Sequence, residues 1–320
     1  MKIFITLFFL LNSFIFADTY PNKPIDLIVG LGKGGSADRM TRNMALFLEE
    51  ELNTKINVIN KKENASLNAA NYILDQKADG YTVFSSTFFP YLSNTILDNK
   101  STYNLDDFQI INLQWFEYDL IAVNKNSKYE TLMEVLNEIK NSDKKLSASV
   151  IYKSSGHLLI KLLLEKLNIP QHKLKLKFFN GGKVARTALI KGQVDLLIIA
   201  AQGSEKYREY LKPLAISSNK RSNRWDAPTL NEAIDLVGVK IPLINGPIRG
   251  FAVSKKFKEK FPSRYKTLEN ALKRILAKRK VQKALKQKNI GYTWIGSEKS
   301  TEILKDSYNI FKTYNYLLKD

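Results

Sequence analysis

Short apolar segments alternate with amphipathic helical segments from residue 25 onward, and this alternation restricts the fold more than any other feature. In the helical segment that follows the first strand, Met40, Met44 and Leu48 recur at helical spacing. Because strands joined through helices run parallel and are covered on both faces, we predict an α/β fold with parallel sheets. The first predicted strands are 25–29, 56–60 and 81–85, and the helices between them are 37–52 and 66–75.

The alternation restarts after a long apolar stretch at 110–123. A chain of 320 residues is long enough for about two domains. We therefore predict two α/β lobes, with the end of the chain packing back on the first. The later predicted strands are 146–151, 174–179, 194–200 and 250–253, and the later helices are 131–139, 155–167, 184–190, 257–288 and 300–317.

The N-terminus has the composition of a secretory signal peptide. Lys2 is positively charged, residues 3–16 are almost wholly apolar, and Ala17 precedes the polar Asp18. The apolar run is short for a membrane span, so we predict that residues 1–17 are cleaved and that the mature chain is soluble and exported. An uncleaved membrane anchor is the alternative. The absence of cysteine excludes a disulfide framework and a thiolate metal site.

The chain is strongly basic, with 50 Lys and Arg residues against 31 Asp and Glu residues. A nucleic-acid-binding patch would gather such charge on one face. Here the lysines are spread over the whole chain, which favours a solvated basic surface and no nucleic-acid partner. Such a surface still attracts small anions toward a cleft.

A glycine-rich loop joins the first predicted strand to the first helix. Gly30, Gly32 and Gly35 satisfy the G-x-G-x-x-G pattern of dinucleotide-binding proteins. That site also needs an acidic residue at the end of the second strand, but Asn60 and Lys61 stand there. Nicotinamide cofactors are moreover scarce outside the cytoplasm. We therefore reject the dinucleotide interpretation and expect no cofactor.

The same loop is suited to a small anion. Gly34 and Gly35 allow a tight turn, Ser36 lies at the expected N-cap, and Lys33 adds a positive charge at the rim. The first amides of a helix bind a carboxylate as readily as a phosphate. Asp38 favours the helix dipole or braces the loop. A capped turn that binds nothing remains the alternative.

Several motifs resemble, in the same order, those of the Bug family, the extracytoplasmic receptors of tripartite tricarboxylate transporters. They cover nearly the whole mature chain: Tyr20-Pro21-Asn22-Lys23-Pro24, Gly34-Gly35-Ser36-Ala37-Asp38, Asp79-Gly80-Tyr81-Thr82, Asp107-Phe108, His157-Leu158, Phe179-Asn180-Gly181-Gly182, Gly192-Gln193-Val194-Asp195 and Pro228-Thr229-Leu230-Asn231-Glu232. The loop departs from the family in Gly30, Gly32 and Lys33, where relatives usually have Pro, a small residue or Pro, and Ala or Pro. Phe179-Asn180 also replaces a Tyr-(Lys/Arg) pair, so the ligand can differ from the commonest family ligands.

The resemblance implies a two-lobe periplasmic binding protein of the Venus flytrap type, with crossovers near 114–120 and 246–251. Residues 18–117 plus 250–320 would form the first lobe and 118–249 the second. It implies a monomeric receptor that binds a small carboxylate in the periplasm and delivers it to membrane permease subunits. A sensory receptor that signals to a two-component kinase is the alternative.

The resemblance also places one end of the ligand at the glycine loop and the other in the second lobe. The Ser-rich turn before His157 and the loop at Gly181 would meet that second end. The full set of candidate ligand-binding residues is Lys33, Gly34, Gly35, Ser36, Asp38, Ser86, Thr87, Ser154, Ser155, His157, Gly181 and Gly182. A pure N-cap role for the serines remains open, as does a core role for Phe88, Phe89 and Tyr91 after the third strand.

The sequence offers little for catalysis. His157 and His172 are the only histidines, and neither has the spacing of a metal site. His157 stands near a helix start, where a hydrogen-bonded, helix-orienting role is favoured over a general base. No G-x-S-x-G motif surrounds Ser154 or Ser155. We therefore expect no metal and no enzymatic activity, with an exported α/β enzyme as the remote alternative.

Overall fold

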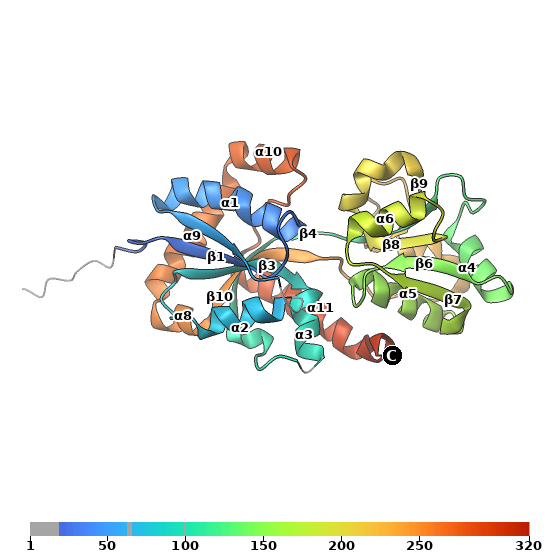
Figure 1. The fold of residues 1–320 in the computed structure, drawn as a ribbon, viewed down its shortest axis with the longest axis horizontal. Helices are drawn as coiled ribbons and strands as arrows, with labels where there is room; N and C mark the ends of the chain where they lie inside the picture. Colours follow the sequence, from blue (N-terminus) through green and yellow to red (C-terminus); the bar gives the residue numbers. More distant parts are fainter. Residues whose placement is uncertain (1–18, 63–65, 99, 320) are drawn as a thin grey trace, which may run out of the picture.

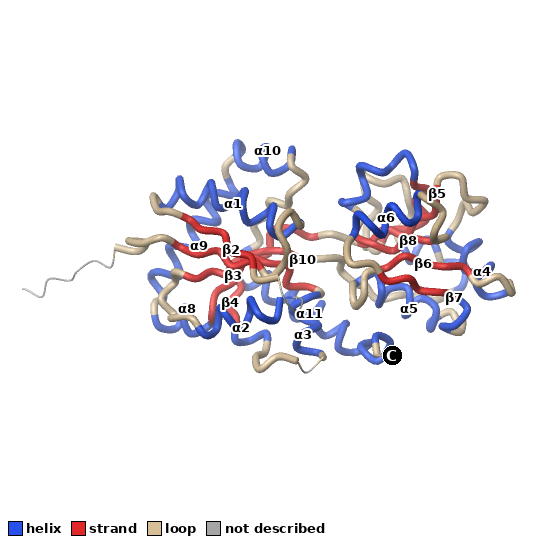
Figure 2. The backbone as a smooth tube through the Cα atoms, in the orientation of Figure 1, coloured by secondary structure: helices blue, strands red, loops and turns tan. Residues whose placement is uncertain are grey.

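The computed structural model describes residues 19–62, 66–98 and 100–319, so the predicted signal peptide at 1–17 lies outside the described residues. The chain folds into two lobes joined by extended segments (Figure 1). Each lobe contains a five-stranded sheet with helices on both sides (Figure 2). Among the residues described, no helix is both long and apolar enough to cross a membrane.

The first lobe is built on the sheet β2-β1-β3-β10-β4. Met40 and Met44 of α1 pack with Leu268 and Leu272 of α9 over one face, and Leu92 of α3 belongs to the core on the other face. Its strands are β1 (Ile25–Val29), β2 (Ile56–Asn60), β3 (Thr82–Phe89), β4 (Phe108–Phe116) and β10 (Ile248–Ser254). Its helices are α1 (Ser36–Leu52), α2 (Leu67–Asp75), α3 (Tyr91–Leu97), α8 (Lys255–Lys260), α9 (Pro262–Ala277), α10 (Arg279–Gln287) and α11 (Gly296–Tyr314), with 3-10 turns η2 (Leu105–Asp107) and η6 (Asn315–Leu318).

The second lobe is built on the sheet β7-β6-β8-β5-β9. Leu158 and Leu162 of α5 lie fully buried in the large core, and Ala185 and Leu189 of α6 lie in a smaller core on the other face. Its strands are β5 (Asp119–Asn124), β6 (Leu146–Val150), β7 (Leu174–Phe178), β8 (Leu196–Ala200) and β9 (Leu211–Ile216). Its helices are α4 (Leu132–Asn141), α5 (Ser155–Lys166), α6 (Gly182–Ile190) and α7 (Leu230–Ala233), with 3-10 turns η3 (Gln171–Lys173), η4 (Gln202–Tyr210) and η5 (Asp235–Val237).

The two sheets are mixed, so the prediction of parallel sheets was wrong in part. β1 runs parallel to β2 and β3, but β10 runs antiparallel to β3 and β4. In the second lobe β5 runs antiparallel to β8 and β9. The strands that cross between lobes cause this mixture, because each enters its sheet from the end that faces the other lobe.

Some predicted elements were divided or missed. The apolar stretch 110–123 is two strands, β4 and β5, which belong to different sheets. The predicted helix 257–288 is three helices, since Pro262 begins α9 and Lys278 separates α9 from α10. Neither β9 nor α3 was predicted. Phe88 and Phe89 lie within β3 and are buried in the core, which settles their role.

The chain passes between the lobes at two places that lie side by side. β4 ends at Phe116 in the first sheet and β5 begins at Asp119 in the second, and the chain returns to the first sheet before β10 at Ile248. The amide of Glu117 donates to the carbonyl of Pro247 at 3.2 Å. A side chain at Gly246 would come within 2.6 Å of the Glu117 carbonyl, so only glycine allows this close approach.

Candidate functional site

The loop between β1 and α1 lies on the side of the first lobe that faces the second lobe (Figure 1). α1 begins at Ser36, and Gly35 is its N-cap, so the prediction that Ser36 would be the N-cap was wrong by one residue. Gly34 has φ of +77°, a conformation that glycine adopts at little cost. Side chains at Gly32 or Gly34 would meet no atom within 4 Å, so this loop borders open space.

Two backbone amides of this loop donate hydrogen bonds within the protein and are therefore not available to a ligand. The amide of Gly34 donates to Asp38 Oδ2 at 2.9 Å, and the amide of Gly35 donates to the Gly32 carbonyl at 3.3 Å. Among the described residues, the amides of Ser36 and Ala37 make no hydrogen bond. The first amides of α1 are therefore the donors that stay available at this helix start.

Asp38 is saturated by protein donors. Its carboxylate accepts from the amide of Gly34, from Arg42 Nε at 3.0 Å and from Asn60 Nδ2 at 2.9 Å. Burial opposes its ionisation, but these hydrogen bonds prevail and hold the pKa of Asp38 below its usual range. The geometry thus supports the bracing role rather than direct contact with a ligand.

Three other candidates of the first lobe differ in surroundings. Lys33 is exposed at the rim of the loop. Ser86 is fully buried beside Ser66, with 3.4 Å between the hydroxyl oxygens. Thr87 is buried and its Oγ1 has no hydrogen-bond partner among the described residues. Thr87 pairs with Arg249 of β10 across the sheet, which places it beside the charged residues described below.

In the second lobe, the turn before α5 is held by its own side chains. Ser154 is the N-cap, and its Oγ accepts from the amide of His157 at 3.2 Å. His157 is buried, and its Nδ1 accepts from the amide of Lys153. The expected helix-orienting role of His157 matches this geometry. Ser155 is fully buried at the first position of α5, and its Oγ has no complete hydrogen bond among the described residues.

The third helix start belongs to α6, which begins at Gly182 with Gly181 as its N-cap. A side chain at Gly181 would meet no atom within 4 Å, so this loop also borders open space. A side chain at Gly182 would come within 2.5 Å of Arg186 Nη1. Arg186 was not predicted as a site residue, and it lies directly behind this loop.

Charged residues at the crossovers form the floor between the lobes, and the sequence analysis missed them. Arg249 Nη1 donates to Glu117 Oε1 at 2.6 Å, and both side chains are almost wholly buried. The Arg249 guanidinium lies 4.4 Å from the centre of the Trp115 ring. A charge directly after an apolar strand, as at Glu117, and a charge inside one, as at Arg249, are the signals that could have revealed them.

Asp119 begins β5 next to this pair and is fully buried. The pKa of Asp119 is raised to about 7, mainly by burial and in smaller part by the negative charge of Glu117, while Ser155 beside it acts in the opposite direction. Its Oδ2 has no hydrogen-bond partner among the described residues. Tyr91 at the start of α3 lies within electrostatic range of Asp119 and Arg249. Buried polar atoms without partners are typical of places where water or a ligand binds.

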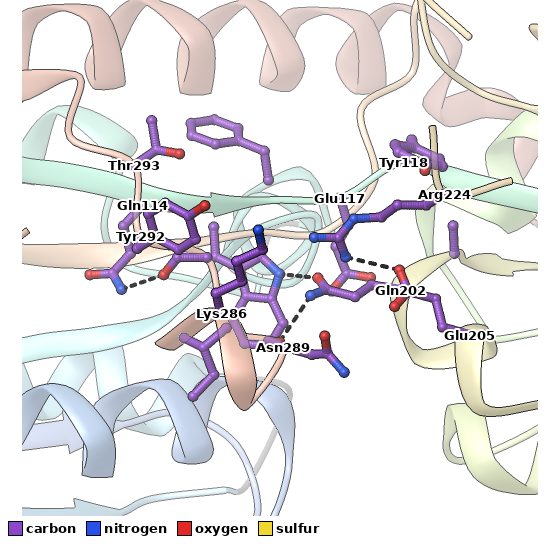
Figure 3. Close-up of a pocket in the computed structure, with 15 residues that line it drawn as sticks. Gln114, Glu117, Tyr118, Gln202, Glu205, Arg224, Lys286, Asn289, Tyr292 and Thr293 are labelled. Carbon is purple, nitrogen blue, oxygen red and sulfur yellow. Dashed lines mark hydrogen bonds and ion pairs between the residues drawn. The ribbon is translucent and has the colours of Figure 1, made fainter. Parts of the chain in front are cut away.

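A cavity of about 280 Å³ lies between the lobes beside the crossovers (Figure 3). Trp115 and Glu117 line it from the first crossover, and Gln202 and Glu205 line it from the second lobe. Its size suits a small molecule. None of the twelve predicted site residues lines this cavity.

The lobes touch at several places besides the crossovers, and at one of them η6 packs on α5, where Tyr316 Oη donates to Glu165 Oε1 at 2.7 Å. On one side, Asn94 Nδ2 donates to the Lys153 carbonyl at 2.6 Å, and Lys153 Nζ pairs with Asp98 at 2.5 Å. On the other side, Gln202 accepts from Trp115 Nε1 at 2.5 Å and donates to the Asn289 carbonyl at 2.9 Å (Figure 3). The described residues contain no group of three side chains that could hold a metal ion.

Comparisons with known proteins agree with this architecture. The sequence profile described as "Tripartite tricarboxylate transporter family receptor" matches residues 40–312. A UPF0065 protein of Bordetella pertussis is 25% identical over 209 residues, which span 64% of this chain and 64% of that protein. The protein BugT of Bordetella pertussis is 27% identical over 222 residues, which span 68% of this chain and 67% of that protein. These alignments cover about two thirds of the length of each relative.

Solved structures share the fold over nearly the whole chain. A TctC solute binding protein from Polaromonas has a TM-score of 0.76 at 24% identity, covering 93% of this chain and 99% of that one. MatC from Rhodopseudomonas palustris with bound malate has a TM-score of 0.71 at 20% identity, covering 94% and 100%. An R. palustris protein with adipate has a TM-score of 0.74 at 18% identity, covering 93% and 98%.

The two-lobe α/β fold and the family resemblance drawn from the sequence motifs are thereby confirmed. This family consists of solute-binding receptors and not of enzymes, in agreement with the expectation from the sequence. The chain belongs to the tripartite tricarboxylate transporter family of receptors.

Proposed function

We propose that this receptor captures a small carboxylate between its lobes in the periplasm and delivers it to the membrane permease of a tripartite tricarboxylate-type transporter. One observation carries the proposal. The helix start of α1, with the amides of Ser36 and Ala37 available, faces the second lobe, where α5 and α6 begin. Helix starts attract anions through their amides and dipoles, and such sites suit a carboxylate.

The charges around the cleft support an anionic ligand. Lys33 stands at the rim of the first loop, and Arg186 lies behind the loop of the second lobe. The basic surface of the chain, with a net charge of +19, would raise the local concentration of anions. Two proteins of the same fold carry malate and adipate, which are both small carboxylates.

Calorimetry tests the proposal directly. The mature protein, without residues 1–17, is titrated with a panel of mono-, di- and tricarboxylates and with both nicotinamide dinucleotides. We expect saturable binding of at least one carboxylate and no binding of the dinucleotides. Ligand recovered unchanged after incubation separates a receptor from an enzyme. Dinucleotide binding without carboxylate binding would overturn the proposal.

Cellular location is tested separately. We expect the mature protein to begin at or near Asp18 and to be found in the periplasmic extract, because residues 1–17 have the composition of a signal peptide. The intact mass of the extracted protein measures the cleavage point. Retention of residues 1–17 in the membrane fraction would contradict this part of the proposal.

A further inference from the structure

The outer face of α10 carries positive charge and no negative charge. The helix and the residue on either side of it contain six Lys or Arg residues and no Asp or Glu. Val281 and Leu285 are buried in the core of the first lobe, whereas Arg279, Lys283 and Lys286 are exposed. Residues three and four positions apart share a face of a helix, so these three cations lie together. A basic amphipathic helix of this kind is typical of a surface that contacts an anionic partner.

The carboxylates of α1 that reach this region are paired with other cations. Glu51 pairs with both Arg274 and Lys278, and Glu50 pairs with Lys280. Among the residues that the structure describes, none of the three outer cations of α10 forms an ion pair. Their positive charges therefore repel one another without compensation from the described part of the chain.

A row of side chains on α1 continues this face. Arg39 Nη1 donates to the Lys288 carbonyl at 3.2 Å, and Lys288 Nζ donates to Asn43 Oδ1 at 2.6 Å. Leu46 shares a face of α1 with Arg39, Asn43 and Glu50, because these positions follow one another at spacings of three and four. Leu46 is 61% exposed. We call this surface the α1–α10 face, which consists of Arg39, Leu46, Arg279, Lys283, Lys286 and Lys288.

The first lobe has a second basic helix, and it lies elsewhere. Basic residues are spread along the whole sequence, so a local excess needs a comparison. α8 contains four lysines, but Glu259 stands among them. α8 lies at the opposite edge of the first lobe from α10 (Figure 1). The two helices thus offer similar numbers of cations at separate places on one lobe.

We infer that the α1–α10 face is an interaction surface for the anionic lipid surface of a membrane. This assignment is separate from the proposed function, because it holds whichever ligand the cleft binds. Two features favour lipid over an acidic protein. Most of the cations are lysines, which act as point charges and need no fixed partner geometry. Leu46 adds an apolar side chain, and basic and apolar side chains together suit the headgroup region of a bilayer.

A membrane held against this face would lie beside the gap between the lobes. Lys286 lines the inter-lobe cavity, and the Asn289 carbonyl accepts from Gln202 Nε2 of the second lobe at 2.9 Å. Under the proposed function, the receptor would therefore be concentrated at the surface in which its permease is embedded, with the inter-lobe cavity close to that surface.

The experiment is co-sedimentation of the mature, ligand-free protein with lipid vesicles. One set of vesicles contains equal parts of phosphatidylcholine and phosphatidylglycerol, and the other contains phosphatidylcholine alone. At about 0.05 M salt we expect binding to the anionic vesicles and at least ~10-fold weaker binding to the neutral ones. At about 0.5 M salt binding to the anionic vesicles should be lost, because the ions screen the attraction.

Two matched triple variants locate the contact. Each replaces three exposed cations by Gln, a good helix former, so both proteins should stay folded. The substitutions are Arg279→Gln, Lys283→Gln and Lys286→Gln in α10, and Lys255→Gln, Lys256→Gln and Lys260→Gln in α8. The α10 variant should bind anionic vesicles about 10- to 100-fold more weakly than the wild-type protein. The α8 variant should lose less than about threefold, since its charges lie away from the contact.

Two further measurements keep the test independent of the variants. Circular dichroism establishes that each variant is folded. Amide hydrogen exchange of the wild-type protein should slow in α10 on addition of anionic vesicles and should stay unchanged in α8. Soluble poly-glutamate serves as a probe for an acidic protein partner, and it should bind more weakly than the anionic vesicles at the same salt concentration.

Equal weakening by the two triple variants, or equal protection of α8 and α10, would overturn the inference, because overall charge and not the α1–α10 face would then drive binding. Failure to bind anionic vesicles at low salt would also overturn it. Binding to poly-glutamate without binding to vesicles would overturn it in favour of an acidic protein partner. All of these results leave the proposed function intact, since calorimetry with carboxylates involves no membrane.

Discussion

Arg249 and Glu117 form a buried ion pair, 2.6 Å between Nη1 and Oε1, at the point where the chain crosses from one lobe to the other. Arg249 belongs to β10, whereas Glu117 follows β4 and donates its amide to Pro247. The pair thus joins the two crossovers through both backbone and side chains. The hinge segments of two-lobe proteins change their backbone angles during closure. This ion pair therefore lies in the segments that move when the lobes close.

Breaking this pair from one side should be strongly destabilising. Arg249→Met leaves the Glu117 carboxylate buried without its partner, and we expect the free energy of unfolding to fall by about 3–5 kcal/mol. Urea unfolding followed by circular dichroism measures the change. The double variant Glu117→Gln, Arg249→Met should recover part of the loss. A double variant that is no more stable than Arg249→Met would contradict this account of the pair.

Asp119 should make stability depend on pH. Folding raises its pKa to about 7, so the native state holds a proton between about pH 4 and 7 that the unfolded state has released. The free energy of unfolding therefore falls as pH rises through this window and levels off above it. We expect the wild-type protein to lose roughly 2–3 kcal/mol more than Asp119→Asn between pH 5 and pH 8. Parallel pH profiles of the two proteins would refute the assignment.

Much of the fold could be predicted because its signals are local. The strand at 56–60 and the helix that ends at Leu52 follow from periodicity and apolar runs, and the structure confirms both. The division of 110–123 into β4 and β5 could not be predicted. Both halves are apolar, and only the long-range pairing of each with its own sheet separates them. The direction of each strand within its sheet also depends on long-range pairing, so it could not be predicted either.

The candidate site likewise contains some residues that could be predicted from local sequence signals and others that could not. The loops at Gly34, Ser154 and Gly181 could be predicted, because glycine turns and helix caps have local signatures. The floor of the cleft could not be predicted from local signals. Glu117 and Arg249 are 132 positions apart, and only the folded crossovers bring them together. Arg186 stands in an ordinary helical pattern, and only the folded chain brings Gly203 against its guanidinium.

Asp38 should matter for binding although it is saturated by protein donors. Its carboxylate fixes the amide of Gly34, so Asp38→Ala should loosen the loop that presents the amides of Ser36 and Ala37. Loss of these charge-assisted hydrogen bonds should weaken carboxylate affinity by about 10- to 100-fold. Calorimetric titration of the wild-type protein and the variant with a carboxylate that the wild-type protein binds measures this change in affinity. Asp106→Ala, at an exposed ion pair with Lys305, serves as the control and should have no effect.

The lowered pKa of Asp38 also determines the pH range over which its carboxylate stabilises the loop. Because folding lowers the pKa of Asp38, its stabilising contribution is present above its unfolded value of 3.8 and is lost as pH falls through the folded value. Binding that depends on the loop should therefore be intact at neutral pH. An Asp38→Ala protein that binds the carboxylate with wild-type affinity at pH 7 would show that the loop needs no brace.

The contact between Asp98 and Lys153 should control how far the lobes open. Lys153 belongs to the second lobe and Asp98 to the end of α3 in the first, with 2.5 Å between the charged atoms. Asp98→Ala removes this restraint, so we expect the free variant to have a larger radius of gyration than the free wild-type protein. A ligand shifts the equilibrium between open and closed forms only by its differential affinity for them. Small-angle scattering with and without a bound carboxylate measures both effects.

Saturating ligand should bring the wild-type protein and Asp98→Ala to the same compact radius, because contacts of the ligand with both lobes then replace the missing ion pair. The variant should also bind more weakly, since a wider free state is less populated in the closed form. Glu138→Ala, which breaks an ion pair with Lys128 inside the second lobe, should change neither quantity. If Asp98→Ala and Glu138→Ala scatter alike in the free state, the contact between Asp98 and Lys153 does not limit opening, and this prediction is wrong.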